Sequence, residues 1–219
     1  TSAAEKPCNE KSVYEKMAGI TGDTAWNDPQ TAVKTLILEH HMAARRMGFI
    51  DMWEALHSVS RLQTGLRDGS LSALRFFSHV VLPLVQCHRH NDDFGVARIV
   101  RTMSPLFIKR EIEANEKGQA ETIRVAQRAV ESLLMLWSEE TDPLFLDVLC
   151  RIRETGLFIL PEAIRGYSAL GNYDEEKGES DDERKADEIV AWRSFLETPF
   201  SQIEPYSQYI QGKGAYDTH

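Results

Sequence analysis

Helical periodicity is the feature of this chain that most constrains its fold. From Asp51 onward, apolar residues such as Met52, Leu56, Val59 and Leu62 recur at steps of three or four. This spacing gives a helix one buried face. The pattern returns in several later segments that are separated by Gly, Pro and Asp residues. It predicts a helical body of roughly 150 residues.

Breaking and capping residues predict where these helices begin and end. The expected helical segments are residues 11–18, 40–47, 71–87, 94–103, 111–137, 144–154, 161–170 and 187–196. Pro83 should bend the third of them, because proline has no backbone N–H and clashes with the preceding turn. Asp92 or Asp93 can cap the fourth. Gly156 and Gly171 are expected stops.

Extended segments are expected near both ends of the chain. Residues 32–39 form a short, β-branched and apolar run typical of a buried strand, which leads directly into the helix at 40–47. Residues 208–210 and 215–219 also have strand-like composition. The predicted fold class is therefore mainly α, a multi-helix body inserted between a few strands of a partial α/β domain. Because the chain begins without Met and stops within an expected strand, we expect it to be a segment of a larger protein.

Composition limits the classes of function. The 219 residues carry a formal net charge of −9, which argues against a free-standing nucleic-acid binder without excluding a local basic face. Nine acidic and three basic side chains, a net charge of −6, lie in residues 174–188. This run is expected to be a solvated loop or a helix start. The sequence shows neither a signal pattern nor an obvious membrane span, and its three cysteines are widely spaced, so a reducing cytoplasm is expected.

No arrangement of catalytic residues can be defended from spacing. The Gly-Lys-Gly at 212–214 is too short for a phosphate loop. Cys87, His88 and His90 are the densest group of possible zinc ligands, but no second ligand pair accompanies them, so a polar turn is the favoured interpretation. Cys150 lies on an apolar helical face and is expected to be packing. The sequence therefore predicts no catalytic residue, cofactor site or metal site in this segment.

Two segments resemble the UvrD/Rep-type superfamily 1 DNA helicases. Residues 33–46, Val-Lys-Thr-Leu-Ile-Leu-Glu-His-His-Met-Ala-Ala-Arg-Arg, are similar to a strand and helix start in that family's second motor domain. Residues 215–219, Ala-Tyr-Asp-Thr-His, are similar to the strand opening a motif that continues Gln-Gly-x-Lys-Gly-Leu-Glu-Phe. In the family, a helical 2B-type insertion lies between these landmarks.

The resemblance implies that the chain consists of three parts. Residues 1–50 would belong to a partial RecA-like, 2A-type segment and residues 51–198 to the 2B-type insertion, with an acidic loop near 174–188. Residues 199–219 would return to the RecA-like segment.

It also implies a function. The parent protein would be an ATP-dependent DNA helicase of the DNA unwinding and repair type, a hydrolase that binds ATP and Mg. This segment would handle DNA or regulate the motor, and by itself it would be inactive. Its partners would be DNA and the remaining motor domains. The residues implied to lie near DNA are His40, His41, Arg45, Thr218 and His219.

Two alternatives remain open. The first is a helical protein-interaction module without catalytic activity, which would bind partner helices in its grooves. The second is a small metalloenzyme built on Cys87, His88 and His90.

Overall fold

The computed structural model describes residues 6–23, 26, 40–108, 116–138, 141–168 and 182–216. The chain divides into two compact units, residues 1–39 and residues 40–219. In the first unit, α1 spans Lys6–Thr21, which confirms the helix expected at 11–18. The strand expected at 32–39 lies outside the described residues.

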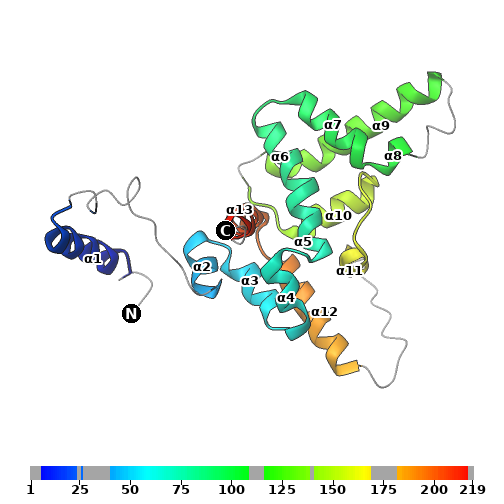
Figure 1. The fold of residues 1–219 in the computed structure, drawn as a ribbon. Helices are drawn as coiled ribbons and strands as arrows, with labels where there is room; N and C mark the ends of the chain where they lie inside the picture. The colour runs from blue at the N-terminus through cyan, green and yellow to red at the C-terminus, as the bar shows by residue number, and fades with distance from the viewer. Residues whose placement is uncertain are drawn as a thin grey trace. The chain divides into compact units, whose positions relative to one another are not determined.

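The second unit is built from helices (Figure 1). In chain order they are α2 (His40–Met47), α3 (Ile50–His57), α4 (Ser60–Asp68), α5 (Ser72–Phe76), η2 (Phe77–Val81), α6 (Leu82–Arg89), α7 (Asp93–Met103), α8 (Pro105–Ile108), α9 (Glu116–Leu134), η3 (Met135–Trp137), α10 (Phe145–Thr155), α11 (Glu162–Arg165), η4 (Gly166–Ser168), α12 (Asp182–Leu196), η5 (Phe200–Gln202) and α13 (Ile203–Tyr216). The mainly α prediction is confirmed. Within the described ranges there is no β-strand, only an isolated antiparallel bridge between Leu144 and Pro199.

The C-terminal segment corrects the sequence prediction. Residues 208–210 and 215–216, expected to be extended, belong to α13, and residues 217–219 are not described. Ile203 and Tyr206 are buried one helical turn apart, and the Tyr206 hydroxyl donates a hydrogen bond to the Leu66 carbonyl oxygen at 2.9 Å. Burial of this helical face outweighs the strand preference of the Tyr and Ile residues and the weak helix preference of the glycines.

Phenylalanine rings from four elements meet in the core. Phe145 at the start of α10 is fully buried, and its ring centroid lies 4.9 Å from that of Phe77, 4.5 Å from that of Phe195 and 5.3 Å from that of Phe200. Backbone hydrogen bonds beside this cluster join Phe145 N–H to the Thr198 oxygen at 3.1 Å and Phe200 N–H to the Pro143 oxygen at 2.8 Å. The cluster thus fixes the end of α12 against the start of α10.

The bend expected at Pro83 takes the form of a π-helical segment. η2 covers Phe77–Val81, immediately before α6, and Pro83 lies at the first positions of that helix. A proline removes one hydrogen bond to the preceding turn and its ring presses against a carbonyl there, so the wider π turn accommodates it. Phe77 and Val81 remain fully buried through this change.

One described region, Ser60–Arg89, is long and apolar enough to cross a membrane by length and composition, which the sequence analysis did not anticipate. The left-handed backbone of Gly69, with φ of 73°, interrupts it after α4. Leu66, Leu74 and Leu84 within it are fully buried in the core of the second unit. A core helix of a protein passes the same test of length and composition.

Asp92 caps α7, as the sequence predicted. Its Oδ1 accepts a hydrogen bond from the Gly95 N–H at 2.8 Å. We expect Asp92→Ala to lower the free energy of unfolding by about 1 kcal/mol, because the first turn of α7 loses its cap. Asp92→Asn keeps an acceptor and should stay within a few tenths of a kcal/mol of the parent. Urea denaturation measures both, and equal losses in the two variants would contradict the capping role.

Candidate functional site

An apolar groove runs between α7, α8, α9 and η3. Its volume is about 1260 Å³, above the roughly 300–1,000 Å³ usual for small-molecule pockets. The apolar residues that line it include Val96, Val100, Phe107, Ile123, Val130 and Met135. The groove is thus large enough for a chain segment.

The sequence of α7 and α9 explains the groove. Both helices are amphipathic, and Val100 of α7 and Val130 of α9 turn into the core at 5% and 8% exposure. Other apolar side chains of the groove remain open to solvent, since Ile123 is 57% exposed and Met135 is 67% exposed. Isolated exposed apolar residues are ordinary on a protein surface, but apolar residues gathered in a groove mark an interaction site.

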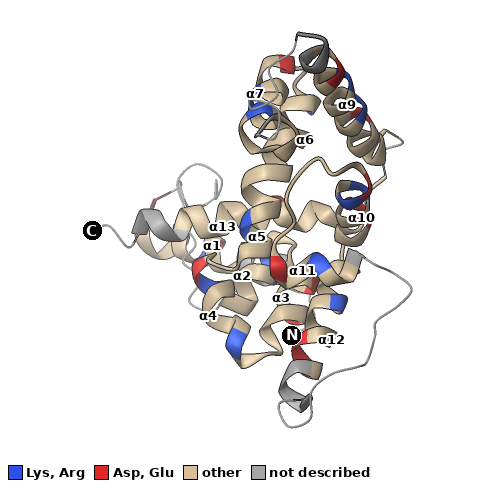
Figure 2. Cartoon of the chain, turned by 90° about the vertical axis from the view of Figure 1, so that its right-hand side faces the viewer, with Lys and Arg blue, Asp and Glu red and all other residues tan. Residues whose placement is uncertain are grey.

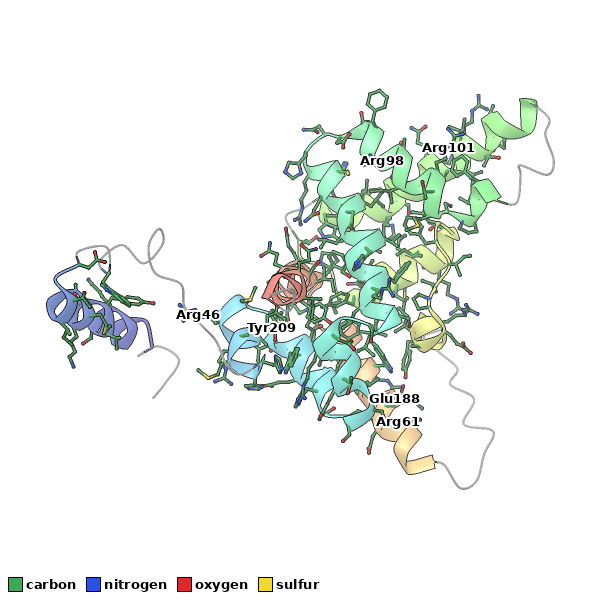
Figure 3. The ribbon with its side chains drawn as sticks, in the orientation of Figure 1. Arg46, Arg61, Arg98, Arg101, Glu188 and Tyr209 are labelled. Atoms are coloured by element: carbon green, nitrogen blue, oxygen red, sulfur yellow. The ribbon has the colours of Figure 1, made fainter. Side chains whose placement is uncertain are left out.

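Charged side chains lie along the same groove. Asp93 is in the first turn of α7 and Arg101 is in its last turn, and both line the groove together with Glu131 of α9. Figure 3 shows Arg98 and Arg101 on successive turns of α7. Figure 2 shows basic and acidic segments interspersed on α9. The groove therefore presents charges of both signs and has no purely basic wall.

A second feature is a cluster of histidine and aromatic side chains where α2, α3 and α13 meet. A hydrogen bond joins His40 Nδ1 to the Tyr209 hydroxyl. The His40 ring centroid lies 5.9 Å from that of Trp53, which stacks on His57 at 5.8 Å. Figure 3 shows Tyr209 on α13 next to α2. Trp53 Nε1 is buried without a hydrogen-bond partner among the residues that the structure describes.

The predicted DNA-contact residues fall into three groups. His40 is half-buried and engaged with Tyr209, whereas half-buried His41 places Nε2 3.3 Å from Glu54 Oε1. Arg45 is exposed on α2. Thr218 and His219 lie outside the described residues. His40 and His41 at the start of α2 are thus engaged by Tyr209 and Glu54, and Arg45 lies on the exposed side of the same helix.

The Cys87 region forms the polar turn that the sequence favoured. The His90 ring Nδ1 hydrogen-bonds with the Gln86 carbonyl oxygen at 2.7 Å, and His88 and His90 are both exposed. Burial raises the pKa of the Cys87 thiol, and the Asp92 carboxylate raises it further. A raised pKa disfavours the thiolate that binds zinc. Among the described residues, no group of three His, Cys, Asp or Glu side chains could hold a metal ion.

The histidine cluster predicts a pH dependence of stability. Burial lowers the pKa of His57 below its ordinary 6.5, and the charges of Arg67 and His41 lower it further. Below pH 6.5 the unfolded state therefore takes up a proton more readily than the folded state, so this group makes the free energy of unfolding fall as the pH drops. We expect His57→Gln to lose less stability between pH 7 and pH 5 than the parent. Urea denaturation at both pH values tests this, and an identical loss would refute it.

The groove was not identified from the sequence, where α7 and α9 were treated only as core helices. The apolar period gave no signal, because Ile123 is seven residues before Val130 and so shares the face of the buried residues of α9, yet its side chain is 57% exposed. Comparison with protein-family models, curated proteins and solved structures gave no match for this chain.

Proposed function

We propose that this chain is the helical accessory part of an ATP-dependent, UvrD/Rep-type DNA helicase that acts in the cytoplasm. The observation that carries the proposal is the resemblance of residues 33–46 to the strand and helix start of that family's second motor domain. The helical state of His40–Met47 supports it, because the second half of the resembling segment is expected to be helical. ATP and Mg would be bound by other parts of the parent protein.

In this proposal the chain handles DNA or regulates the motor. Arg45 is exposed on α2 beside Arg46, and guanidinium groups suit phosphate contacts. His40 and His41 would help to shape this end of the second unit. Because α13 continues to Tyr216, a return to the motor domain's sheet would begin after that residue.

Reading the gene on both sides of this segment tests the proposal. We expect a Gly-Lys-Thr or Gly-Lys-Ser phosphate loop upstream and Gln-Gly-x-Lys-Gly-Leu-Glu-Phe directly after His219. An intact gene product without a phosphate loop would refute the helicase proposal, since ATP hydrolysis in this family depends on that loop.

The second candidate function is a helical protein-interaction module without catalytic activity. The apolar groove favours it, because Ile123 and Met135 expose apolar surface beside the buried residues of α7 and α9. The two candidates are compatible if the accessory part of the motor recruits a partner. A gene product with no motor motifs would leave the interaction module as the whole function.

A further inference from the structure

We infer that the apolar groove binds one amphipathic helix of a partner protein, with a basic side chain near one end of its buried face and an acidic side chain near the other. This inference rests on the interaction-module candidate and names the chemistry of its partner. It does not depend on the motor proposal.

The shape of the groove supports a helix as the occupant. α7 has 11 residues and forms one wall, so the wall is about 16 Å long at 1.5 Å per residue. A helix of about three turns matches this length and presents apolar anchors at positions i, i+4 and i+7. The exposed side chains of Ile123 and Met135 give such anchors apolar surface on the opposite wall.

The charges of the groove define the chemistry of the partner. Asp93 and Arg101 lie at opposite ends of α7 and both line the groove. Eight residues of helix separate them, or about 12 Å. A partner helix with Lys and Glu eight residues apart would place each charge beside its opposite, whereas a helix basic at both ends would set one Lys against Arg101.

Two synthetic peptides test this chemistry. Each has leucines at i, i+4 and i+7 and a fluorescent label; the dipolar peptide carries Lys and Glu eight residues apart, and the basic peptide carries Lys at both positions. Fluorescence anisotropy with the full chain should show that the dipolar peptide binds about tenfold more tightly. Arg101→Glu should reverse the order, because both ends of the groove wall are then acidic.

Variants on exposed residues locate the binding site. Ile123→Asp should weaken the dipolar peptide at least about tenfold, because a carboxylate replaces an apolar contact. Val190→Asp makes the same kind of change on α12, outside the groove, where Val190 is 62% exposed, and it should leave binding unchanged. Far-UV circular dichroism verifies that both variants are folded.

The outcomes distinguish the chemistry of the partner from the presence of a binding site in the groove. Reversal of the peptide order by Arg101→Glu, together with loss of binding in Ile123→Asp alone, supports the inference. The same order in both proteins would overturn the partner chemistry while the groove remains a binding site. No saturable binding of either peptide would overturn the inference, whereas the choice between the interaction module and the motor would still be decided by the gene sequence.

Discussion

Replacing Phe145 by alanine is expected to lower the free energy of unfolding by about 3–5 kcal/mol. Phe145 is fully buried and contacts three other phenylalanine rings, with centroid distances from 4.5 to 5.3 Å. The substitution removes a large apolar surface and leaves a cavity between α10, α12, η2 and η5. Urea denaturation followed by far-UV circular dichroism measures the loss.

Phe94→Ala is the matched control. It makes the same chemical change at a side chain that is 90% exposed, so the free energy of unfolding should change by no more than about 0.5 kcal/mol. Similar losses in the two variants would mean that Phe145 is not at the centre of the core.

Gly69→Ala is expected to lower the free energy of unfolding by about 2–5 kcal/mol. Gly69 ends α4 with a left-handed φ of 73°, and a Cβ atom there would lie 2.8 Å from Ile210 Cγ2 on α13. The left-handed backbone costs a non-glycine residue about 1–2 kcal/mol. Crowding against Ile210 adds about 1–3 kcal/mol.

Gly156→Ala separates these two effects. Gly156 ends α10 with φ of 63°, and a Cβ atom there would meet nothing within 4 Å. It should therefore show only the backbone cost of about 1–2 kcal/mol. Equal losses at Gly69 and Gly156 would indicate that α13 does not pack against the end of α4. In a protein that already carries Ile210→Ala, the Gly69→Ala substitution should lower the free energy of unfolding by less than it does in the parent.

The helices of the second unit could be predicted where local signals and the apolar period agree. Asp92 caps α7, Gly156 ends α10 and Pro83 disturbs the helix before α6, each for a reason that is visible in the neighbouring residues. The acidic run at 174–188 was expected to be a solvated loop or a helix start, and residues 182–188 belong to α12, whereas the earlier residues of the run lie outside the described ranges. At these positions the neighbouring residues were sufficient to predict where a helix begins, ends or bends.

α13 could not be predicted, because its helical state depends on distant contacts. Tyr206 donates its hydrogen bond to Leu66, 140 residues earlier in the chain, and Tyr209 hydrogen-bonds with His40. Locally, the Tyr and Ile residues in this segment favour extended structure, and the Gly residues disfavour a helix. The tertiary contacts decide the conformation.

The candidate sites were predicted only in part for a similar reason. His40 and His41 were named because of the resemblance, but the sequence does not reveal that Tyr209 and Glu54 engage them. The groove depends on which apolar residues stay uncovered after α7 and α9 pack. That property arises from two helices together and is not present in either one alone.

ATP hydrolysis by the full-length gene product tests the helicase proposal most directly. The purified protein would be assayed with Mg and ATP, with and without single-stranded DNA. We predict hydrolysis that single-stranded DNA stimulates, as expected of a DNA motor whose accessory part is this chain. A folded full-length protein that hydrolyses no ATP under either condition would contradict the proposal.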